Sequence, residues 1–362
     1  MQQKNYNIIG VMSGTSLDGI DLAYVNIILG KEISATILVA ETVPYTAHWK
    51  STLQKAHTLS KAELSHLDEE YTQHLAKVIN SFKQKHKIEN LDAVCSHGHT
   101  ILHQPDKGFT LQIGNLTSLA TLINTRVVCD FRVQDVALGG QGAPLVPIGD
   151  RLLFSNYDYC LNLGGFANVS TEKEGKRIAY DICAVNTVLN KYAEYLGVAY
   201  DDRGAFAKAG TLNPTLLEQL NSLSFFNSPP PKSLGIEWVH QTVLPLIERF
   251  KLEPKDVLAT FTMHIAMQIK RQFTRGSAVL VTGGGAYNTY LLELMQKDTD
   301  VEYVLPEASL IEYKEALIFA LLGVLKLENR VNTLASVTGA KEDHCAGEVY
   351  GEGLYSKTSA GC

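Results

Sequence analysis

Several features that would mark other classes of protein are missing from this sequence of 362 residues. No apolar run approaches the roughly 20 residues that a bilayer-spanning helix needs, so we expect no membrane domain. The amino-terminal residues lack a basic segment followed by an apolar one, so we expect no secretory signal and predict a cytoplasmic protein. The chain is 45% hydrophobic and 19% charged, which is typical of a globular protein with a large core.

Cysteine pairs and an excess of positive charge are also absent. The six cysteines include no C-x-x-C pair and have no histidine at zinc-ligand spacing, so we interpret them as reduced thiols that mostly fill the core. The formal net charge is −6. Nucleic acids and membrane surfaces require clustered Lys and Arg, so neither is an expected partner. The expected partner is a small molecule.

One succession of elements occurs twice along the chain, whose length favours two domains. A strand, a glycine loop, a strand, a turn, a strand and a helix are predicted over residues 6–82 and again over residues 157–196. The first of these helices begins at Ser60, which forms a capping box with Glu63. Two such units facing each other would form a cleft with a glycine loop on each side, where backbone N–H groups can bind nucleotide phosphates. Two ordinary hairpin turns are the alternative.

The first glycine loop, residues 10–21, combines glycines, hydroxyls and carboxylates at one predicted hairpin tip. Glycines let the backbone close on phosphate oxygens, hydroxyls donate to them, and a carboxylate can order the water shell of Mg²⁺. The Gly-Lys-Ser/Thr sequence of a P-loop is absent, which excludes that class of ATPase. The candidate nucleotide-binding residues here are Gly14, Thr15, Ser16, Leu17, Asp18, Gly19, Ile20 and Asp21.

Two other glycine clusters are candidates for the same nucleotide site. The second hairpin contains Gly164 and Gly165, and the predicted buried strand 278–282 is followed by Gly283, Gly284, Gly285 and Asn288. A triple glycine after a strand lets an adenosine ring lie flat against the backbone. A simple glycine turn at a strand end explains the pattern equally well, because the dinucleotide-binding pattern is incomplete.

Histidines occur at positions 97, 99 and 103 of one predicted strand. A regular strand places residues 97, 99 and 101 on one face, and no carboxylate precedes Asp106. Hydrogen bonding to a polar substrate is therefore favoured over metal binding. Arg132 is the candidate anchor for a substrate carboxylate, with a salt bridge to Asp130 or Asp135 as the alternative.

Two carboxylates are candidates for catalysis. Asp181 is predicted to end the third strand of the second repeat, where it would project toward the first phosphate loop and accept a proton from a nucleophile. Capping of the following helix is the alternative. Glu315 opens a predicted helix over residues 313–327, where helix-dipole stabilisation is the ordinary explanation. The Pro-rich stretch at residues 228–232 is predicted to be a surface loop rather than a domain linker.

Eight segments, in order along the chain, resemble the anhydro-N-acetylmuramic acid kinase family, which belongs to the superfamily of sugar kinases, Hsp70 and actin. They are GVMSGTSLDGID (10–21), SHGHTILHQP (96–105), TLQIGN (110–115), VVCDFRVQD (127–135), LGGQGAPLVP (138–147), LNLGGFANVS (161–170), PPKSLG (230–235) and VTGGGAYN (281–288). The resemblance implies an α/β fold with two duplicated ribonuclease-H-like (actin-like ATPase) domains facing an inter-domain cleft. We place the first domain at residues 1–130 plus about 335–362, and the second at residues 131–334.

The resemblance also implies a reaction. ATP, with Mg²⁺, and water would open the 1,6-anhydro ring of anhydro-N-acetylmuramic acid and give N-acetylmuramic acid 6-phosphate in peptidoglycan recycling. By resemblance, Asp181 is the general base, Glu315 helps hold the water and sugar, His97 and Arg132 bind the sugar, residues 14–21 bind ATP, and the protein is a homodimer. The alternatives are a kinase of the same fold acting on another sugar hydroxyl and a catalytically silent nucleotide-binding regulator.

The sequence departs from the family pattern after the catalytic position. The family usually has DTGPGN there, whereas this chain has Asp181-Ile-Cys-Ala-Val-Asn186, so we expect the backbone to turn differently. His99 stands where the family usually has glutamine. The magnesium ligands are not assigned.

Overall fold

The computed structural model describes residues 3–14, 16–351 and 353, and divides into two compact units. The first unit comprises residues 1–153 and 313–362, and the second comprises residues 154–312. The limits expected from the sequence, at 130/131 and near 334/335, differ because helix α5 (Val146–Leu153) and most of helix α13 (Ala308–Leu327) belong to the first unit. A side chain at Gly149 would collide with Ile318, so these two helices pack in direct contact.

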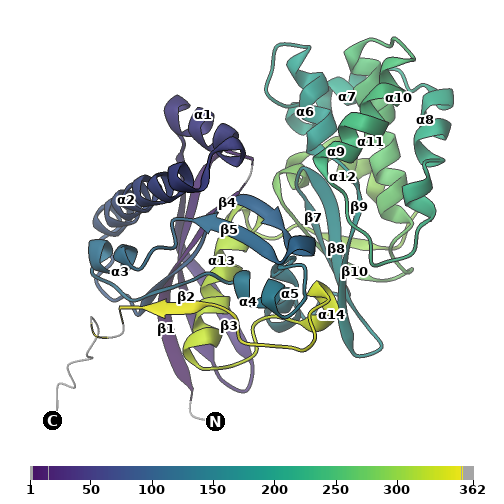
Figure 1. Cartoon of the computed structure of the whole chain (residues 1–362). Helices are drawn as coiled ribbons and strands as arrows, with labels where there is room; N and C mark the ends of the chain where they lie inside the picture. Colours follow the sequence, from purple (N-terminus) through teal and green to yellow (C-terminus); the bar gives the residue numbers. More distant parts are fainter. Residues whose placement is uncertain (1–2, 15, 352, 354–362) are drawn as a thin grey trace. The chain divides into compact units, whose positions relative to one another are not determined.

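The first unit is built on a seven-stranded sheet (Figure 1). Its strand order is β12-β6-β4-β1-β2-β3, with β5 paired to β4. Strands β1, β2 and β3 are antiparallel neighbours, whereas β4 runs parallel to both β1 and β6. The strands are β1 (Lys4–Ser13), β2 (Gly19–Leu29), β3 (Ile33–Pro44), β4 (Ala93–Gln104), β5 (Phe109–Ile113), β6 (Val127–Cys129) and β12 (Glu348–Tyr350).

Both faces of this sheet are covered. On one face α2 (Lys61–Lys85) buries apolar residues at helical spacing, among them Leu67, Tyr71 and Leu75, and its start has the predicted capping box of Ser60 and Glu63. On the other face α13 packs so closely that a side chain at Gly10 would overlap the carbonyl oxygen of Ala316. The remaining helices of the unit are α1 (Ala47–Lys55), α3 (Ser118–Ile123), α4 (Val133–Ala137) and α14 (Ala335–Thr338).

The second unit repeats the strand arrangement of the first. Its sheet has the order β11-β10-β7-β8-β9, in which β7, β8 and β9 are antiparallel and β10 runs parallel to β7 and β11. Each strand thus has a counterpart in the order β6-β4-β1-β2-β3, which confirms the duplicated α/β fold predicted from the sequence. The strands are β7 (Tyr159–Leu163), β8 (Phe166–Lys173), β9 (Lys176–Ala184), β10 (Ala278–Thr282) and β11 (Glu302–Val304).

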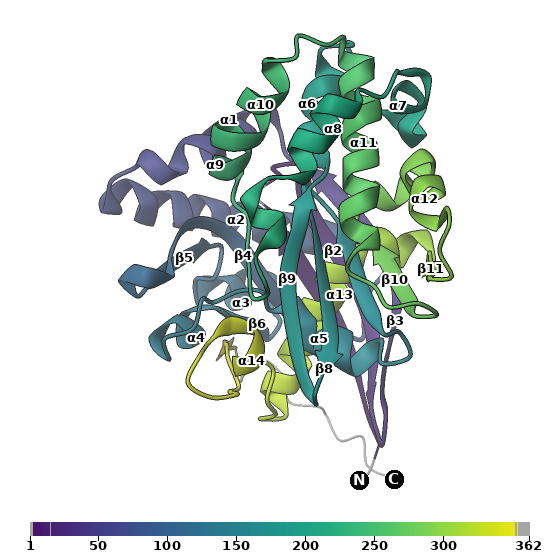
Figure 2. The ribbon, with the colours of Figure 1, turned by 90° about the vertical axis from the view of Figure 1, so that its right-hand side faces the viewer.

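The core of the second unit lies between its sheet and a group of helices that includes α6 and α11 (Figure 2). Fully buried residues of α11, such as Phe261 and Ile265, join Leu161 and Val169 of the sheet in one apolar cluster. The helices are α6 (Asn186–Glu194), α7 (Ala205–Ala209), α8 (Pro214–Asn221), α9 (Ile236–Trp238), α10 (Leu244–Glu248), α11 (Pro254–Lys270) and α12 (Thr289–Gln296). Among the described residues, no helix is both long enough and apolar enough to cross a bilayer.

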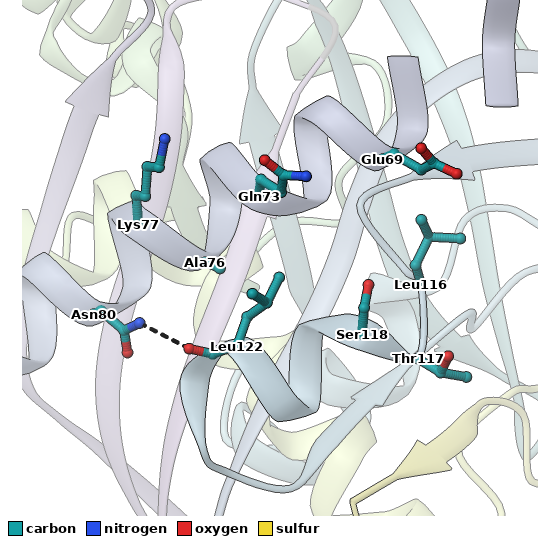
Figure 3. A pocket seen from close by; sticks show the side chains of 9 residues that line it. All are labelled: Glu69, Gln73, Ala76, Lys77, Asn80, Leu116, Thr117, Ser118 and Leu122. Carbon is teal, nitrogen blue, oxygen red and sulfur yellow. Dashed lines mark hydrogen bonds between the residues drawn. The ribbon is translucent and has the colours of Figure 1, made fainter. Parts of the chain in front are cut away.

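A shallow groove of about 610 Å³ runs between α2 and α3 of the first unit (Figure 3). Polar side chains such as Glu69, Gln73 and Lys77 line it, and Asn80 closes one end by donating a hydrogen bond to the carbonyl of Leu122 at 3.1 Å. None of the candidate site residues that the structure describes lines this groove.

Candidate active site

The β1–β2 hairpin carries the first glycine loop, and its glycines have different functions. Side chains at Gly10 and Gly19 would collide with the backbone, the latter at 2.5 Å from the carbonyl oxygen of Val43, so packing requires both glycines. At Gly14 the nearest atom to an added side chain is the Ser16 hydroxyl at 3.5 Å. Nothing in the described protein therefore requires glycine at position 14, which fits a loop that a ligand approaches closely.

The other loop residues divide into exposed and buried ones. Ser16 and Asp18 are exposed, Leu17 is half-buried with φ of 60°, and Thr15 lies outside the described residues. Ile20 is fully buried, so only its backbone is available to a ligand. The half-buried Asp21 accepts a hydrogen bond from the Thr42 hydroxyl at 2.6 Å.

The two glycine clusters of the second unit lie at the same edge of its sheet. Gly164 and Gly165 follow β7 and residues 283–285 follow β10, and these strands are parallel neighbours with Thr282 opposite Asn162. Gly284 is exposed, whereas a side chain at Gly283 would lie 2.5 Å from Asn162 Oδ1. Exposed glycine backbone at the carboxyl ends of parallel strands is a common place for nucleotides.

Asn288 has a structural contact in this region. Its Oδ1 accepts a hydrogen bond from the backbone N–H of Leu291 at 3.0 Å and so caps α12. The side chain is 8% exposed. Its proposed contact with the nucleotide therefore has to come from the side-chain amide nitrogen or the backbone.

Asp181 lies within β9, not at its end as the sequence predicted, because the strand continues to Ala184. A bulge falls just after it, since Asn168 pairs with Asp181 and Ala167 pairs with Cys183. The residues that replace the family's glycine-rich segment are core residues: Ile182, Cys183, Ala184 and Val185 are each at most 1% exposed. Their side chains are thus unavailable to a ligand.

The Pro-rich loop holds the Asp181 carboxylate in place. The backbone N–H of Asp181 donates to the carbonyl of Lys232 at 3.0 Å, and the backbone N–H of Leu234 donates to Asp181 Oδ2 at 2.7 Å. Oδ1 has no hydrogen bond within the described part of the chain. Burial raises the pKa of this carboxyl and the Leu234 N–H opposes the shift. The sequence contained the PPKSLG motif, but only the structure shows that it orients Asp181.

A second bulge separates two histidines that the sequence placed on one face. Along the β1–β4 pairing, Val11 is opposite Ser96 and Ser13 is opposite His99, so β4 carries an extra residue. Gly98 supplies it, with φ of 74°. His97 therefore packs on Phe319 of α13, whereas His99 donates to or accepts from the Ser13 hydroxyl at 2.7 Å on the α2 side. The single-face prediction is wrong because a bulge reverses the alternation of side chains.

Burial keeps both histidines neutral. It lowers the pKa of His99 to about 4 and, with the nearby Arg132 charge, holds that of His97 well below its usual range. His97 Nδ1 lies 2.9 Å from the carbonyl oxygen of Gly98, so it carries the ring proton and Nε2 is the acceptor. Within the described residues no group of three or more His, Cys, Asp or Glu side chains is arranged to hold a metal ion.

Arg132 is oriented by two hydrogen bonds. Its Nε donates to His97 Nε2 at 2.8 Å and its Nη1 donates to the carbonyl oxygen of Gly142 at 2.6 Å. Neither Asp130 nor Asp135 forms an ion pair with it in the described structure, so the alternative from the sequence is not found. Burial lowers the pKa of Arg132 to about 10, so the guanidinium stays charged at neutral pH. Its remaining N–H groups can bind an anion.

Glu315 lies near Arg132 on α13. Its side chain is exposed to solvent, yet the protein atoms around it displace enough water to raise the pKa of the carboxyl. The charge of Arg132 opposes this rise and that of Asp21 adds to it. The first unit thus brings together three candidates from the sequence, Asp21 of β2, Arg132 of the β6–α4 connection and Glu315 of α13. Sequence pattern alone gave no reason to single out Glu315.

Known proteins are similar to this chain along almost its whole length. Residues 6–352 match the model of the family described as anhydro-N-acetylmuramic acid kinase. The protein of that name from Saccharophagus degradans is 35% identical, and the match covers 94% of this chain and 98% of the relative. The one from Pasteurella multocida is 35% identical with 97% and 98% covered, and the one from Bacillus cereus is 33% identical with 94% and 98% covered.

A solved structure, component A of (R)-2-hydroxyglutaryl-CoA dehydratase from Acidaminococcus fermentans, is more distant. It is 14% identical and the match covers 89% of this chain and 99% of that chain, with a TM-score of 0.45.

Proposed function

Because the chain belongs to the anhydro-N-acetylmuramic acid kinase family, we propose that it uses ATP and water to convert 1,6-anhydro-N-acetylmuramic acid into N-acetylmuramic acid 6-phosphate. The family match over residues 6–352 carries this proposal. The local geometry of Asp181 supports it. That carboxylate has one oxygen fixed by a backbone N–H, which leaves the other oxygen to accept a proton.

Asp181 acts in this proposal as general base on a water molecule. The water oxygen forms a bond to the anomeric carbon, its proton passes to Asp181, and the bond from that carbon to the bridging oxygen breaks. The released oxygen at the sixth position forms a bond to the γ-phosphorus and ADP leaves. A base works best when its pKa approaches the working pH, so the raised pKa of the Asp181 carboxyl suits this role.

Residues of the first unit bind the sugar in the proposed reaction. Arg132 uses Nε and Nη1 for His97 and Gly142, so the outer edge formed by Nη1 and Nη2 remains for the lactyl carboxylate. His97 fixes the plane of the guanidinium, and its neutral ring avoids charge repulsion. Glu315 holds the attacking water and the sugar.

The glycine loops bind ATP in the proposal. In the first unit the loop residues Gly14–Asp21 contact the phosphates, and in the second unit Gly164, Gly165, Gly283–Gly285 and Asn288 contact the nucleotide. Backbone N–H groups at such loops form anion-binding nests. Mg²⁺ would neutralise the phosphate charge, and the loop carboxylates Asp18 and Asp21 would order its water shell. The exposed positions of Ser16, Asp18 and Gly284 support this assignment.

The wider setting follows from the substrate. The sugar is a peptidoglycan fragment and ATP is the phosphoryl donor, so we place the reaction in cytoplasmic peptidoglycan recycling. The resemblance to the family supports a homodimer. The net charge of −6 agrees with a small-molecule partner rather than nucleic acid.

Initial rates of ADP release with a panel of sugars test the proposal. With magnesium-ATP, the protein should turn over 1,6-anhydro-N-acetylmuramic acid and leave N-acetylmuramic acid, N-acetylglucosamine and glucose almost unreacted. Faster turnover of a plain sugar would favour a kinase that phosphorylates a free hydroxyl. ATP binding without turnover of any sugar would favour a silent regulator.

A further inference from the structure

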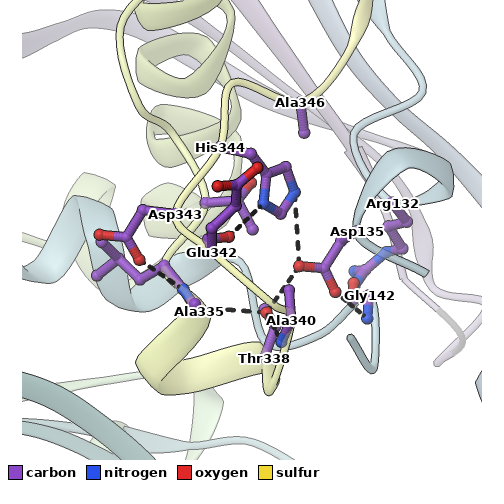
Figure 4. Close-up of polar contacts among 12 residues, drawn as sticks. Arg132, Asp135, Gly142, Ala335, Thr338, Ala340, Glu342, Asp343, His344 and Ala346 are labelled. Atoms are coloured by element: carbon purple, nitrogen blue, oxygen red, sulfur yellow. Dashed lines mark hydrogen bonds and ion pairs between the residues drawn. The ribbon is translucent and has the colours of Figure 1, made fainter. Parts of the chain in front are cut away.

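A buried aspartate supports the backbone that orients Arg132 (Figure 4). Asp135 is fully buried in α4, and its Oδ2 accepts a hydrogen bond from the backbone N–H of Gly142 at 2.6 Å. The carbonyl of the same Gly142 accepts from Arg132 Nη1 at 2.6 Å. Gly142 thus connects the carboxylate of one residue to the guanidinium of the other. These contacts involve a further glycine loop, residues 139–142, which is called the glycine loop below. A side chain at Gly140 would overlap the Asp135 carboxylate, so this loop can close only with glycine there.

The carboxyl-terminal part of the chain completes the environment of Asp135. The Thr338 hydroxyl donates to Oδ1 at 2.7 Å, and His344 Nε2 lies 3.5 Å from the same oxygen. The backbone N–H of Gln141 also donates to the carbonyl of Thr338 at 2.8 Å, which fixes the glycine loop a second time. Asn332 ties this terminal segment to α13 through the carbonyl of Leu322 at 3.1 Å.

A carboxylate in this position is costly unless its oxygens are bonded, because burial removes its water. An apolar side chain would fill the same volume without that cost. The two short bonds to Gly142 and Thr338 are therefore best explained by what they hold in place, namely the loop carbonyl that Arg132 needs.

We propose that Asp135, held by Thr338, is a positioning residue for sugar binding and acts by fixing Gly142, whose carbonyl sets the direction of the Arg132 guanidinium. The inference rests on the proposed function, since it assigns a purpose to Arg132. It extends that function to the carboxyl-terminal segment, whose described residue Thr338 is hydrogen-bonded to Asp135 and to Gln141 of the glycine loop.

The role predicts selectivity for one part of the substrate. Among the substrate contacts in the proposal, a misdirected guanidinium loses only the one with the lactyl carboxylate. The loss should therefore be large for 1,6-anhydro-N-acetylmuramic acid and small for 1,6-anhydro-N-acetylglucosamine, the same ring system without the lactyl carboxylate. ATP binding should not change.

Two variants and one matched control test this. Asp135→Asn keeps the shape of the side chain but has one acceptor oxygen, whereas the Gly142 N–H and the Thr338 hydroxyl each donate to a separate oxygen of Asp135. Thr338→Val removes only the hydroxyl. Thr125→Val is the control, because Thr125 is another buried threonine of the first unit whose hydroxyl is hydrogen-bonded, to Ile123. Thr338→Val serves on its own if Asp135→Asn does not fold.

The kinetic measurement is kcat/KM for the two anhydro sugars, with the inhibition constant used for any sugar that is not turned over. Each test variant should raise KM for the lactyl sugar about tenfold. KM for ATP and the constants for the sugar without the carboxylate should stay within about twofold. Combining Thr338→Val with Arg132→Lys should cost no more than Arg132→Lys alone, because both act on one contact.

A substrate-free measurement separates this inference from the proposed function. In protein labelled with ¹⁵N-arginine, the Arg132 Nε–H signal should exchange slowly with water in the wild type and in Thr125→Val, and faster in Asp135→Asn and Thr338→Val. Faster exchange in a protein inactive on every sugar would uphold the positioning role and overturn the proposed function. The positioning role would be overturned if the test variants changed neither the exchange rate nor KM, or if they lost kcat/KM equally with both sugars. It would also be overturned if Thr125→Val had the same effect, or if the losses in Thr338→Val and Arg132→Lys were additive.

Discussion

Replacing Asp181 with Asn should abolish most turnover while leaving the fold intact. The substitution keeps an oxygen that can accept the Leu234 N–H, whose bond to Oδ2 is 2.7 Å long in the structure. The amide nitrogen then occupies the position of Oδ1, the oxygen available to take the proton from water. An amide cannot act as a base there, so the variant removes the chemistry and retains the shape.

The expected loss follows from the role. General-base catalysis contributes about 10²–10⁴-fold, so kcat should fall by that factor, equivalent to about 3–5 kcal/mol of barrier. ATP affinity should remain within about twofold, because Asp181 binds no phosphate in the proposal.

The stability of Asp181→Asn should not fall below that of the wild type, and at neutral pH it should be slightly higher. Burial raises the pKa of the Asp181 carboxyl above that of the unfolded chain. Its contribution to stability is therefore present below the unfolded pKa and is lost as the pH rises through the folded pKa. At pH 7 the charged carboxylate opposes folding, and Asn removes that cost. In the wild type, kcat/KM should fall as the pH drops through the raised pKa.

The assay combines ADP release, thermal unfolding and nucleotide titration on Asp181→Asn and on a matched control. Asp256→Asn is suitable, since Asp256 in the same unit also accepts a backbone N–H, from Thr211 at 2.7 Å. The control should retain wild-type turnover. A fully active Asp181→Asn would refute the general-base role, and an inactive but unfolded one would show that Asp181 serves the fold.

Four further substitutions have expected outcomes. Gly98→Ala should lower the free energy of unfolding by about 2 kcal/mol in denaturant titrations and raise KM for the sugar. The reason is that φ of 74° disfavours a side chain, and that the bulge sets the direction of two histidines. Wild-type values for both quantities would contradict this. Gly14→Ala should fold normally and raise KM for ATP, whereas Gly19→Ala should lower the melting temperature. Only at Gly19 would the added methyl group collide with a backbone atom, at 2.5 Å. The reverse pattern would count against the assignment of this loop to ATP. Asp150→Asn should destabilise the protein by about 3 kcal/mol in denaturant titrations. The substitution removes the negative charge from a buried ion pair in which Lys314 lies 2.7 Å from the Asp150 carboxylate. A loss below about 1 kcal/mol would show that the ion pair is not needed for stability.

The repeat and most elements could be predicted from the sequence because they depend on local patterns. The capping box of Ser60 and Glu63 and the periodicity of α2 are contained in consecutive residues, and β10 was expected at its observed limits of 278–282. Duplicated strand order followed from two similar successions of strands and glycine loops.

Bulges and long-range contacts could not be predicted, because they depend on the partner strand or on distant residues. The extra residue at Gly98 is visible only against β1, and it separates His97 from His99. The contact that orients Asp181 comes from Leu234, more than fifty residues away. The sequence indicates Asp135 only as an alternative salt-bridge partner for Arg132, whereas the structure connects the two through Gly142.

Turnover in oxygen-18 water tests the central claim most directly. The protein is incubated with magnesium-ATP and 1,6-anhydro-N-acetylmuramic acid, and the sugar product is analysed by mass spectrometry. The account predicts N-acetylmuramic acid 6-phosphate with one solvent oxygen at the anomeric carbon and one ADP per product. A phosphorylated sugar without solvent oxygen, or ADP release with the sugar unchanged, would contradict it.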